Sequence, residues 1–452
     1  MDESAVMDGS AQAREGSHAA VEPRREPSGS LVGEPLCDDL LARGLVHDVT
    51  DVRALADRLR QGRVVLYCGF DPTAPSLHLG HLVPLLVLRR FARHGHGVLV
   101  VAGGATGMIG DPSGRSSERR LLSEEELERN LAAVERQLAR LVGESAEVLD
   151  NRTWLAGMGV LEFLREVGKH VTVNVMLAKE SVRARVAGSE GISYTEFSYM
   201  LLQAYDFLWL YRHRGCELQI GGSDQWGNIT LGLDLIRRCE GAVAHGLTVP
   251  LVTRSDGQKF GKSEGENIWL DPALTSPYRL WQYFVNTDDR DVARFLMQLT
   301  LLEVDEVRAV VAEHSEAPER RRAQRLLANE VTTLVHGRDA AERAEKASEI
   351  LFGSGAVLTP DVLEMLADEI PTTRVAPDRL PVGLVTLLAE TDLAKSKSDA
   401  RRALEEGSLW LNGRRLSVED EAKQITPSDL VGGRFALARR GRRRWALVDF
   451  SR

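Results

Sequence analysis

The stretch from residue 64 to residue 93 constrains the fold of this chain more than any other feature. An apolar run at 64–67 is followed by a glycine-containing turn at 68–73, and a His-Leu-Gly-His motif at 78–81 opens a helical pattern that continues to Arg93. A strand that passes through a glycine turn into a helix start directs backbone N–H groups and the positive helix end at an anion. The sequence therefore predicts an α/β unit with an anion site at this turn.

Strand and helix patterns alternate beyond this stretch, from about residue 63 to residue 270. Residues 98–102 are typical of a buried strand, and Ser123 opens a capping box that precedes an apolar stripe at helical spacing. Such alternation favours a parallel sheet with ligands at the carboxyl ends of its strands. From about Ser276 to Leu351 the pattern is almost wholly helical and charged, which predicts a separate helical subdomain.

A second motif, Lys-Phe-Gly-Lys-Ser at 259–263, follows the first by about 180 residues and comes after an apolar run at 249–252. Two lysines around a glycine can fold over a polyphosphate and supply charge where it develops in phosphoryl or nucleotidyl transfer. A lysine-bearing surface hairpin is the plain alternative. For the two histidines the alternatives are a metal site, which lacks a third ligand nearby, and ordinary surface histidines.

Charge is unevenly distributed along the chain, which carries a formal net charge of −9. From Pro381 onward there are 14 Lys and Arg against 10 Asp and Glu, or +4, so the first 380 residues carry −13. Between Val431 and Val448 there are six arginines and no acid. This local basic patch on an acidic protein fits RNA contact at one end, although a solvated basic strand would look the same.

The remaining bulk features limit the compartment. Residues 1–33 are polar, which predicts disorder, and they lack the apolar segment of a secretory signal. No apolar run approaches the ~20 residues that cross a bilayer, so no membrane contact is expected. The four cysteines show no zinc or C-x-x-C spacing. A cytoplasmic, reduced protein without a metal site is the simplest interpretation.

The two motifs together resemble the H-I-G-H and K-M-S-K-S signatures of class I aminoacyl-tRNA synthetases, with Leu79 replacing isoleucine and Phe260-Gly261 replacing Met-Ser. The likeness to bacterial-type tyrosyl-tRNA synthetases runs in order from about residue 36 to the C-terminus. It is carried most clearly by the stretches 67–73, 103–114, 196–206 and 219–228. Residues 394–402 and the Asn412-Gly413 turn are similar to the S-four type of RNA-binding module.

This resemblance implies an α/β fold with a Rossmann-like parallel-sheet catalytic domain. The expected organisation is a disordered N-terminal extension over 1–33, the catalytic domain over 34–275, a helical domain that contacts the tRNA anticodon region over 276–352, a linker over 353–380, and a small α/β, S-four-like RNA-binding domain over 381–452. The RNA contacts expected in the last domain are Lys397, Arg401, Arg402, Arg442, Arg443 and Arg444.

The resemblance also assigns roles within the catalytic domain. The catalytic residues would be His78, His81, Lys259, Lys262 and Ser263. The tyrosine-binding residues would be Tyr67 and Asp206 at the phenol, Asp111, Tyr199 and Gln203 at the ammonium group, and Gln219. The ATP-binding residues would be Gly69, Asp71, Thr73, Gly80, Gly222, Asp224, Gln225 and Lys262. Arg115 and Arg119 could add charge in the transition state. Spacing independently places Tyr199, Gln203 and Asp206 on one helix face.

The implied activity is that of a tyrosine–tRNA ligase, which activates tyrosine with ATP and transfers the tyrosyl group to the terminal adenosine of tRNA(Tyr). Mg²⁺ would accompany ATP as substrate, no cofactor would be permanently bound, and the enzyme would be a homodimer. The alternatives are a tryptophanyl-tRNA synthetase-like enzyme, a class I nucleotidyltransferase such as a cytidylyltransferase, and an RNA-binding protein that has lost catalysis. The pairing of Tyr67 with Asp206 favours a phenol as the substrate group.

Overall fold

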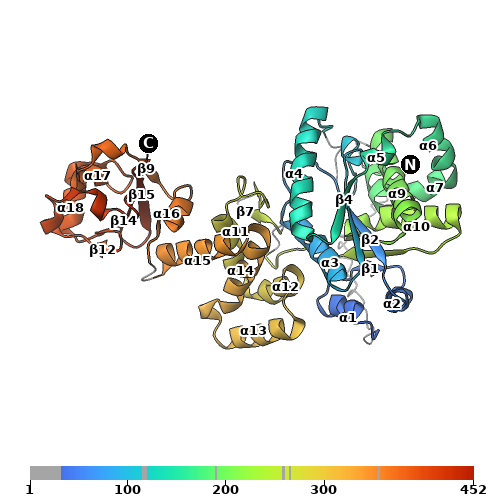
Figure 1. Ribbon diagram of the computed structural model, residues 1–452, viewed down its shortest axis with the longest axis horizontal. Helices are drawn as coiled ribbons and strands as arrows, with labels where there is room; N and C mark the ends of the chain where they lie inside the picture. The colour runs from blue at the N-terminus through green and yellow to red at the C-terminus, as the bar shows by residue number, and fades with distance from the viewer. Residues whose placement is uncertain are drawn as a thin grey trace, which may run out of the picture.

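The computed structural model describes residues 32–114, 120–188, 191–256, 260–263, 266–353 and 357–451. A six-stranded sheet with the order β1-β6-β5-β2-β3-β4 forms the centre of its N-terminal part (Figure 1). Strands β2 to β6 run parallel to their neighbours, and β1 pairs with β6 in the antiparallel sense. The parallel sheet predicted from the sequence is confirmed. The strands are β1 (Asp48–Val49), β2 (Val65–Phe70), β3 (Gly97–Ala102), β4 (Ala146–Asp150), β5 (Cys216–Gly222) and β6 (His245–Val249).

Helices cover both faces of this sheet, as expected for parallel strands that are apolar on both sides. Leu66 and Val98 face α3 (Leu82–Arg93) and α4 (Glu124–Val142) within one apolar cluster. Tyr67 and Leu99, each the next residue along its strand, face α9 (Tyr194–Arg214) and α10 (Trp226–Glu240) in another. The predicted capping box is present at the start of α4, where the side chains and backbone N–H groups of Ser123 and Glu126 bond reciprocally.

A set of short helices joins β4 to α9 and leaves apolar side chains in solvent. Val160 and Leu161 on α6 are 75% and 77% exposed, and Tyr194 at the start of α9 is 72% exposed. The helices are α5 (Arg152–Leu155), α6 (Val160–Glu166), α7 (Val173–Leu177) and α8 (Glu180–Val186). Helices α6, α7 and α9 lie at the same end of the molecule, which is the right end in Figure 1.

The predicted helical region is also present and packs against the sheet domain. Phe284, Phe295 and Leu296 from this region share an apolar cluster with α3. The helices are α11 (Pro277–Val285), α12 (Asp289–Leu299), α13 (Val304–Glu316), α14 (Arg322–His336) and α15 (Arg338–Phe352). A short N-terminal helix, α1 (Pro35–Ala42), and α2 (Val52–Arg60) complete the first half of the chain.

The C-terminal unit lies at the opposite end of the molecule from the six-stranded sheet, beyond α15 (Figure 1). Its five-stranded sheet has the order β12-β11-β14-β15-β9. Asn412 and Gly413 have φ of 46° and 81°, which forms the predicted tight turn between β11 and β12. The elements are α16 (Pro360–Leu366), β9 (Thr372–Arg374), β10 (Val382–Gly383), α17 (Leu384–Ala389), α18 (Lys397–Glu405), β11 (Leu409–Leu411), β12 (Arg414–Arg415), β13 (Gln424–Ile425), β14 (Phe435–Arg440) and β15 (Arg444–Asp449).

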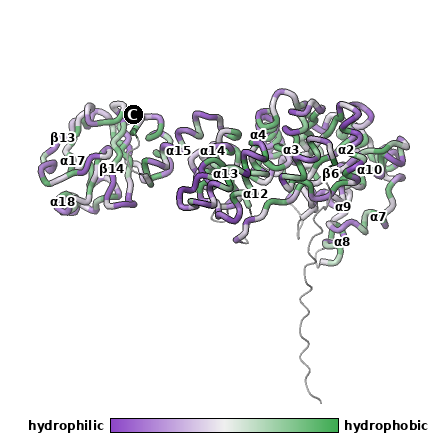
Figure 2. The backbone as a smooth tube through the Cα atoms, turned by 90° about the horizontal axis from the view of Figure 1, so that it is seen from below, coloured by the Kyte–Doolittle hydropathy of each residue, from purple (hydrophilic) through white to green (hydrophobic). Residues whose placement is uncertain are grey.

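The stretch 353–380, for which a linker is expected, contains regular structure. Strand β9 pairs in parallel with β15, and Leu363 of α16 shares an apolar cluster with Phe435 of β14. The C-terminal sheet therefore recruits residues from before Pro381. Figure 2 shows hydrophobic and hydrophilic segments interspersed along the coloured part of the tube. None of the described helices is both long and apolar enough to traverse a bilayer.

Candidate active site

A cavity of about 370 Å³ opens at the carboxyl ends of β2 and β5, where the chain leaves neighbouring strands toward opposite faces of the sheet. This position is the usual ligand site of an open parallel sheet. The cavity brings together nearly all the expected tyrosine and nucleotide residues that the structure describes. Those in its lining are Tyr67, Gly69, Asp71, Thr73, His78, Gly80, His81, Asp111, Tyr199, Gln203, Asp206, Gln219, Gly222, Asp224 and Gln225.

The other expected residues of the catalytic domain are Arg115, Arg119, Lys259, Lys262 and Ser263. Lys259 lies outside the described residues, as do Arg115 and Arg119. Ser263 has a described backbone in β7 (Lys262–Ser263), which pairs with β8 (Glu266–Asn267). Lys262 is half-buried in β7 and does not line the cavity directly.

The inner end of the cavity holds a buried carboxylate between two side-chain donors. Asn151 Nδ2 donates to Asp206 Oδ2 at 3.0 Å, and Trp154 Nε1 donates to Oδ1 at 2.7 Å. Tyr67 on β2 and Gln219 on β5 are each 1% exposed, and the Tyr67 hydroxyl and Gln219 Oε1 have no hydrogen-bond partner among the described residues. Buried polar atoms are normally bonded. These two atoms therefore mark a place where a polar ligand group would complete the site.

The protonation of Asp206 depends on this environment. Burial raises its pKa to about 7, against the hydrogen bonds from Asn151 and Trp154, which lower it. A carboxyl group that titrates near neutrality can accept a hydrogen bond from a phenol when it is ionised. Asn151, which is fully buried, also donates to Thr106 Oγ1 at 3.0 Å and so ties the carboxylate to the turn after β3.

Two further carboxylates, those of Asp71 and Asp111, line the same cavity. Tyr199 donates its hydroxyl to Asp71 Oδ2 at 2.8 Å, and Thr106 Oγ1 donates to Asp71 Oδ1 at 2.7 Å. Gln225 Nε2 donates to Asp111 Oδ2 at 2.7 Å. Asp71 and Gln225, which are expected at the nucleotide, thus hydrogen-bond to residues expected at the ammonium group. Two carboxylates on one wall of the cavity make this wall suitable for a cation.

Glycine is required where β3 ends, because the chain passes directly over Asp71. A Cβ atom added to Gly103 would lie 2.0 Å from Asp71 Oδ1 and 2.4 Å from Thr106 Oγ1. Contacts this short do not occur between non-bonded heavy atoms, so any side chain at 103 would displace the carboxylate. Gly103 is thus a structural part of the site that the sequence motif contains without revealing its reason.

The two histidines of the first motif are stacked, with ring centroids 3.9 Å apart. The backbone N–H of His78 donates to His81 Nδ1 and that of Gly80 donates to His78 Nδ1, both at 3.1 Å. Burial lowers the pKa of both rings, and Lys262 adds to this for His78. With Nδ1 accepting in each neutral ring, the proton is on Nε2, so each ring presents an N–H donor from Nε2.

The second motif lies directly against the first. Gly261, with φ of 76°, has its α-carbon so close to the first motif that an added Cβ would lie 3.2 Å from Leu79 Cβ. Backbone bonds link the segments in series, with Ile268 N donating to Gly261 O at 2.7 Å and Leu79 N donating to Ile268 O at 3.1 Å. The tertiary structure therefore brings together two motifs that are far apart in sequence and sets Lys262 near His78.

The outer part of the cavity is lined by glycines and one further carboxylate. Gly69 has open space around its α-carbon, and a Cβ on Gly222 would lie 2.5 Å from Asp224 Oδ1. Burial raises the pKa of Asp224, and its oxygen Oδ2 accepts from Gln225 Nε2 at 3.3 Å. Bare backbone beside a carboxylate acceptor suits a flat, hydroxyl-bearing ligand such as a ribose.

Sequence reasoning missed Asn151, Trp154, Thr106 and Gly103 as parts of the site. All four follow β3 or β4 at the carboxyl edge of the sheet. Gly103 and Thr106 lie in the stretch 103–114 that carries the family likeness, whereas Asn151 and Trp154 have only their position after β4 as a signal.

The RNA contacts expected in the C-terminal unit differ in how free their charges are. Arg401 pairs with Glu421 and Arg402 pairs with Asp399, both at 2.7 Å. Arg442 and Arg443 are exposed in the turn between β14 and β15. Arg444 donates to the backbone carbonyl of Asp392. Part of this basic surface is therefore already neutralised within the unit.

Comparisons with known proteins agree with this geometry. The family model described as tRNA synthetases class I (W and Y) matches residues 59–353, and that of the tyrosine–tRNA ligase SYY-like C-terminal domain matches residues 362–448. The tyrosine–tRNA ligase of Opitutus terrae is 50% identical over 91% of this chain and 99% of its own. That of Geobacillus stearothermophilus is 49% identical over 91% and 100%. A C-terminally truncated mitochondrial tyrosyl-tRNA synthetase of Aspergillus nidulans superposes with a TM-score of 0.65 at 33% identity, covering 70% of this chain and 94% of that one.

Proposed function

This chain belongs to the tyrosine–tRNA ligases of the class I aminoacyl-tRNA synthetases, and we propose that its β2–β5 cavity forms tyrosyl-adenylate and pyrophosphate from tyrosine and ATP. The observation that supports this most is the inner end of the cavity. There an Asp206 carboxylate, a buried Tyr67 hydroxyl and a buried Gln219 oxygen converge, and the last two have no partner among the described residues. A phenol, which both donates and accepts, fits this set.

The reaction needs no general base, because the tyrosine carboxylate is already a nucleophile at neutral pH. One carboxylate oxygen forms a bond to the α-phosphorus of ATP, the bond from that phosphorus to the bridging oxygen breaks, and pyrophosphate leaves with the electron pair. The Nε2–H groups of His78 and His81 donate to the oxygens of the α-phosphate, where negative charge accumulates. Lys262 supplies a positive charge for the departing pyrophosphate, and we assign Lys259 and Ser263 to the same task.

The amino-acid end of the substrate would be held by charge. We propose that Asp71 and Asp111, with Tyr199, Gln203 and Gln225, hold the α-ammonium group. This extends the ammonium set beyond the residues expected from resemblance alone. Gly69, Thr73, Gly80, Gly222 and Asp224 remain the proposed contacts of the nucleotide.

Magnesium would arrive with ATP. No group of three or more His, Cys, Asp or Glu side chains in the described part of the chain is arranged to hold a metal ion. Mg²⁺ commonly keeps its waters and binds through substrate phosphates, so it needs no protein cage here.

We also propose a cytoplasmic location, because an enzyme that charges tRNA acts where tRNA and ATP are present.

The remaining domains would bind tRNA(Tyr). We propose that the helical region over 276–352 contacts the anticodon region, and that the C-terminal unit contacts RNA through Lys397, Arg401, Arg402 and Arg442–Arg444. The exposed arginines of the β14–β15 turn support this best, because their charges are not paired to carboxylates in the described part of the unit.

We also propose a homodimer formed through α6, α7 and the start of α9. Helix α6 lies at the right end of the molecule in Figure 1, and its Val160 and Leu161 are 75% and 77% exposed, as is Tyr194 at 72%. Apolar and aromatic side chains this exposed mark a surface that a partner would cover. Sedimentation of the wild type and of Leu161→Glu tests this. A wild type that sediments as a monomer at micromolar concentration would overturn the dimer.

Tyrosine-dependent exchange of labelled pyrophosphate into ATP tests the proposed activity. The purified chain should support exchange with tyrosine and much less with tryptophan or phenylalanine. Discrimination against phenylalanine of about 10⁴-fold or more, a range already established for tyrosine-specific enzymes of this class, is expected of a site that bonds a substrate hydroxyl. Equal exchange with tryptophan would support the tryptophanyl alternative instead.

A further inference from the structure

Tyr283 on α11 contacts the second signature motif through its hydroxyl group. The backbone N–H of Gly261, the residue before Lys262, donates to Tyr283 Oη at 2.9 Å. The backbone N–H of Ile268 donates to Gly261 O at 2.7 Å, so both backbone groups of Gly261 are hydrogen-bonded. A residue whose backbone N–H and C=O groups are both hydrogen-bonded has little freedom to change its position.

The residue before Gly261 is held on the same helix by packing. The Phe260 ring lies 6.1 Å from the Tyr283 ring, 6.4 Å from Phe284 and 5.1 Å from Phe295, measured between centroids. The contacts with Tyr283 and Phe295 are edge-to-face, which stabilises a particular ring orientation as well as burying apolar area. Two adjacent residues of the motif, one through its side chain and one through its backbone, are thus attached to α11 and α12.

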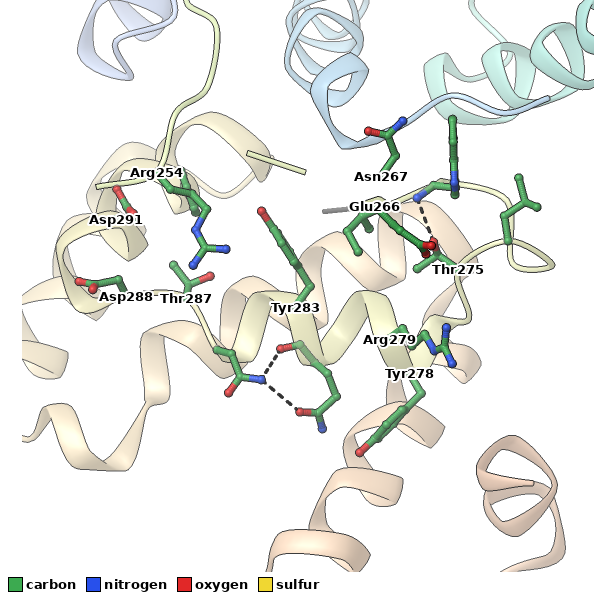
Figure 3. A pocket seen from close by; sticks show the side chains of 16 residues that line it. Arg254, Glu266, Asn267, Thr275, Tyr278, Arg279, Tyr283, Thr287, Asp288 and Asp291 are labelled. Carbon is green, nitrogen blue, oxygen red and sulfur yellow. Dashed lines mark hydrogen bonds between the residues drawn. The ribbon is translucent and has the colours of Figure 1, made fainter. Parts of the chain in front are cut away.

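Because Phe260 and Gly261 are attached to α11 and α12, the position of the next residue, Lys262, is restricted as well. Gly261 packs against Leu79, and Lys262 is close enough to His78 to lower the pKa of that ring. Figure 3 shows the Tyr283 side chain extending from α11 between Arg254 and Glu266, in the lining of a cavity of about 500 Å³. Tyr278, which comes earlier on the same helix, lines the same cavity, but its side chain points in the opposite direction from that of Tyr283.

We infer that Tyr283 is a positioning residue for adenylate formation: its hydroxyl group fixes Gly261 so that Lys262 faces the pyrophosphate that leaves. This inference rests on the proposed function of the site. Because an enzyme gains most from charge that is in place before the reaction, a small loss of order at Lys262 should reduce the rate of the chemical step more than it reduces binding.

The test is Tyr283→Phe, which removes one oxygen and leaves the ring against Phe260. The single-turnover rate of tyrosyl-adenylate formation should fall about three- to tenfold, the range for one lost hydrogen bond, while the dissociation constant of tyrosine changes less than about twofold. Tyr278→Phe is the matched control on the same helix and cavity, and it should leave both quantities unchanged.

A double-mutant cycle separates positioning from a general loss of structure. Lys262→Ala should itself slow adenylate formation strongly, and adding Tyr283→Phe to it should cause no further loss, because there is then no ammonium group to position. Additive losses, or a Tyr283→Phe enzyme that keeps the wild-type rate, would overturn the inference. Absence of tyrosine-dependent exchange in the wild type would instead overturn the proposed function.

Discussion

At the scale of single residues, the chemistry of the site depends on how burial shifts side-chain protonation. Asp206 and the two motif histidines are all moved toward their neutral forms by desolvation. For the histidines this is useful, since a neutral ring with an occupied Nδ1 offers one N–H from Nε2. For Asp206 it creates a pH-sensitive acceptor at the phenol end.

The first prediction concerns this pH sensitivity. As pH rises through about 7, the Asp206 carboxyl ionises and becomes a better acceptor for the tyrosine hydroxyl. The KM for tyrosine in pyrophosphate exchange should therefore fall between about pH 6 and pH 8 in the wild type. In Asp206→Asn the KM should be higher throughout and this fall should be absent. A variant with the wild-type pH profile would assign the titration to another group.

Ionisation of Asp206 should also affect the stability of the unliganded protein, but in the opposite direction: tyrosine binding improves as pH rises, whereas stability decreases. The pKa of Asp206 is about 7 in the folded chain and 3.8 as the ordinary value, so the folded state binds the extra proton between these limits. The free energy of unfolding contributed by Asp206 therefore decreases as pH rises from about 4 to about 7. Thermal unfolding of wild type and Asp206→Asn should diverge over this window, with the variant gaining relative stability as pH rises.

At the scale of elements, the site is built from the ends of parallel strands and the turns that follow them. The turn after β3 carries Gly103 and Thr106, the turn after β4 carries Asn151, and β2 leads into Asp71. These turns bond to one another, so each depends on the close approach of its neighbour.

The second prediction tests that close approach. Gly103→Ala places a Cβ where Asp71 Oδ1 and Thr106 Oγ1 now lie, so the turn, the carboxylate or both must shift. Tyrosine KM should rise by about tenfold or more, and the free energy of unfolding should fall by about 1–3 kcal/mol. Gly157→Ala is the control, because an added Cβ there meets no atom within 4 Å and it should change neither quantity.

At the scale of the whole molecule, the adenylate site and the C-terminal sheet are at opposite ends, with the helical region between them (Figure 1). All residues of the cavity precede residue 261, and the C-terminal sheet begins with β9 at Thr372. The two ends can therefore be separated by truncating the gene, provided that the chain is cut before the strands and helices that belong to the C-terminal sheet. The strand order of that sheet, which includes β9, sets this limit.

The third prediction follows from that order. A chain ending at Gly353 should keep tyrosine-dependent pyrophosphate exchange almost intact and lose most aminoacylation of tRNA(Tyr). A chain ending at Arg379 should exchange equally but be more prone to aggregate, because α16 and β9 would remain without β14 and β15 to pack against. Full-rate charging of tRNA by the shorter chain would show that the C-terminal unit is dispensable for RNA contact.

The fourth prediction concerns the charge of the C-terminal unit. Binding of tRNA should weaken steeply with salt, because Lys and Arg contacts to phosphate release counterions. Replacing Arg442, Arg443 and Arg444 together with Gln should flatten the dependence of log affinity on log salt concentration. Replacing Arg401, which already pairs with Glu421, should change it less. Pyrophosphate exchange serves as the control and should be unaffected by either change.

Much of this organisation was determined by local sequence. Apolar runs and glycine turns determined the strands around β2 and β3, Ser123 and Glu126 set the start of α4, and helical spacing placed Tyr199, Gln203 and Asp206 on one face. The cap of α4 and the shared helix face depend on contacts within a few residues, so a linear pattern contains them. Strands β2 and β3 pair with distant strands, but their buried apolar runs are themselves visible in the sequence. The Asn412-Gly413 turn belongs to the same class.

Only the tertiary structure decided what depends on distant partners. Strand β9 was not foreseen, because its three residues gain strand structure by pairing with partners in β15 that lie 75 residues later. Asn151 and Trp154 became part of the site because parallel strands bring their turns to Asp206, and Tyr283 reached Gly261 because α11 packs beside the second motif. Sequence alone thus specified the elements around the motifs and the motif chemistry, whereas packing specified strand β9 and which backbone and side-chain groups hold that chemistry in place.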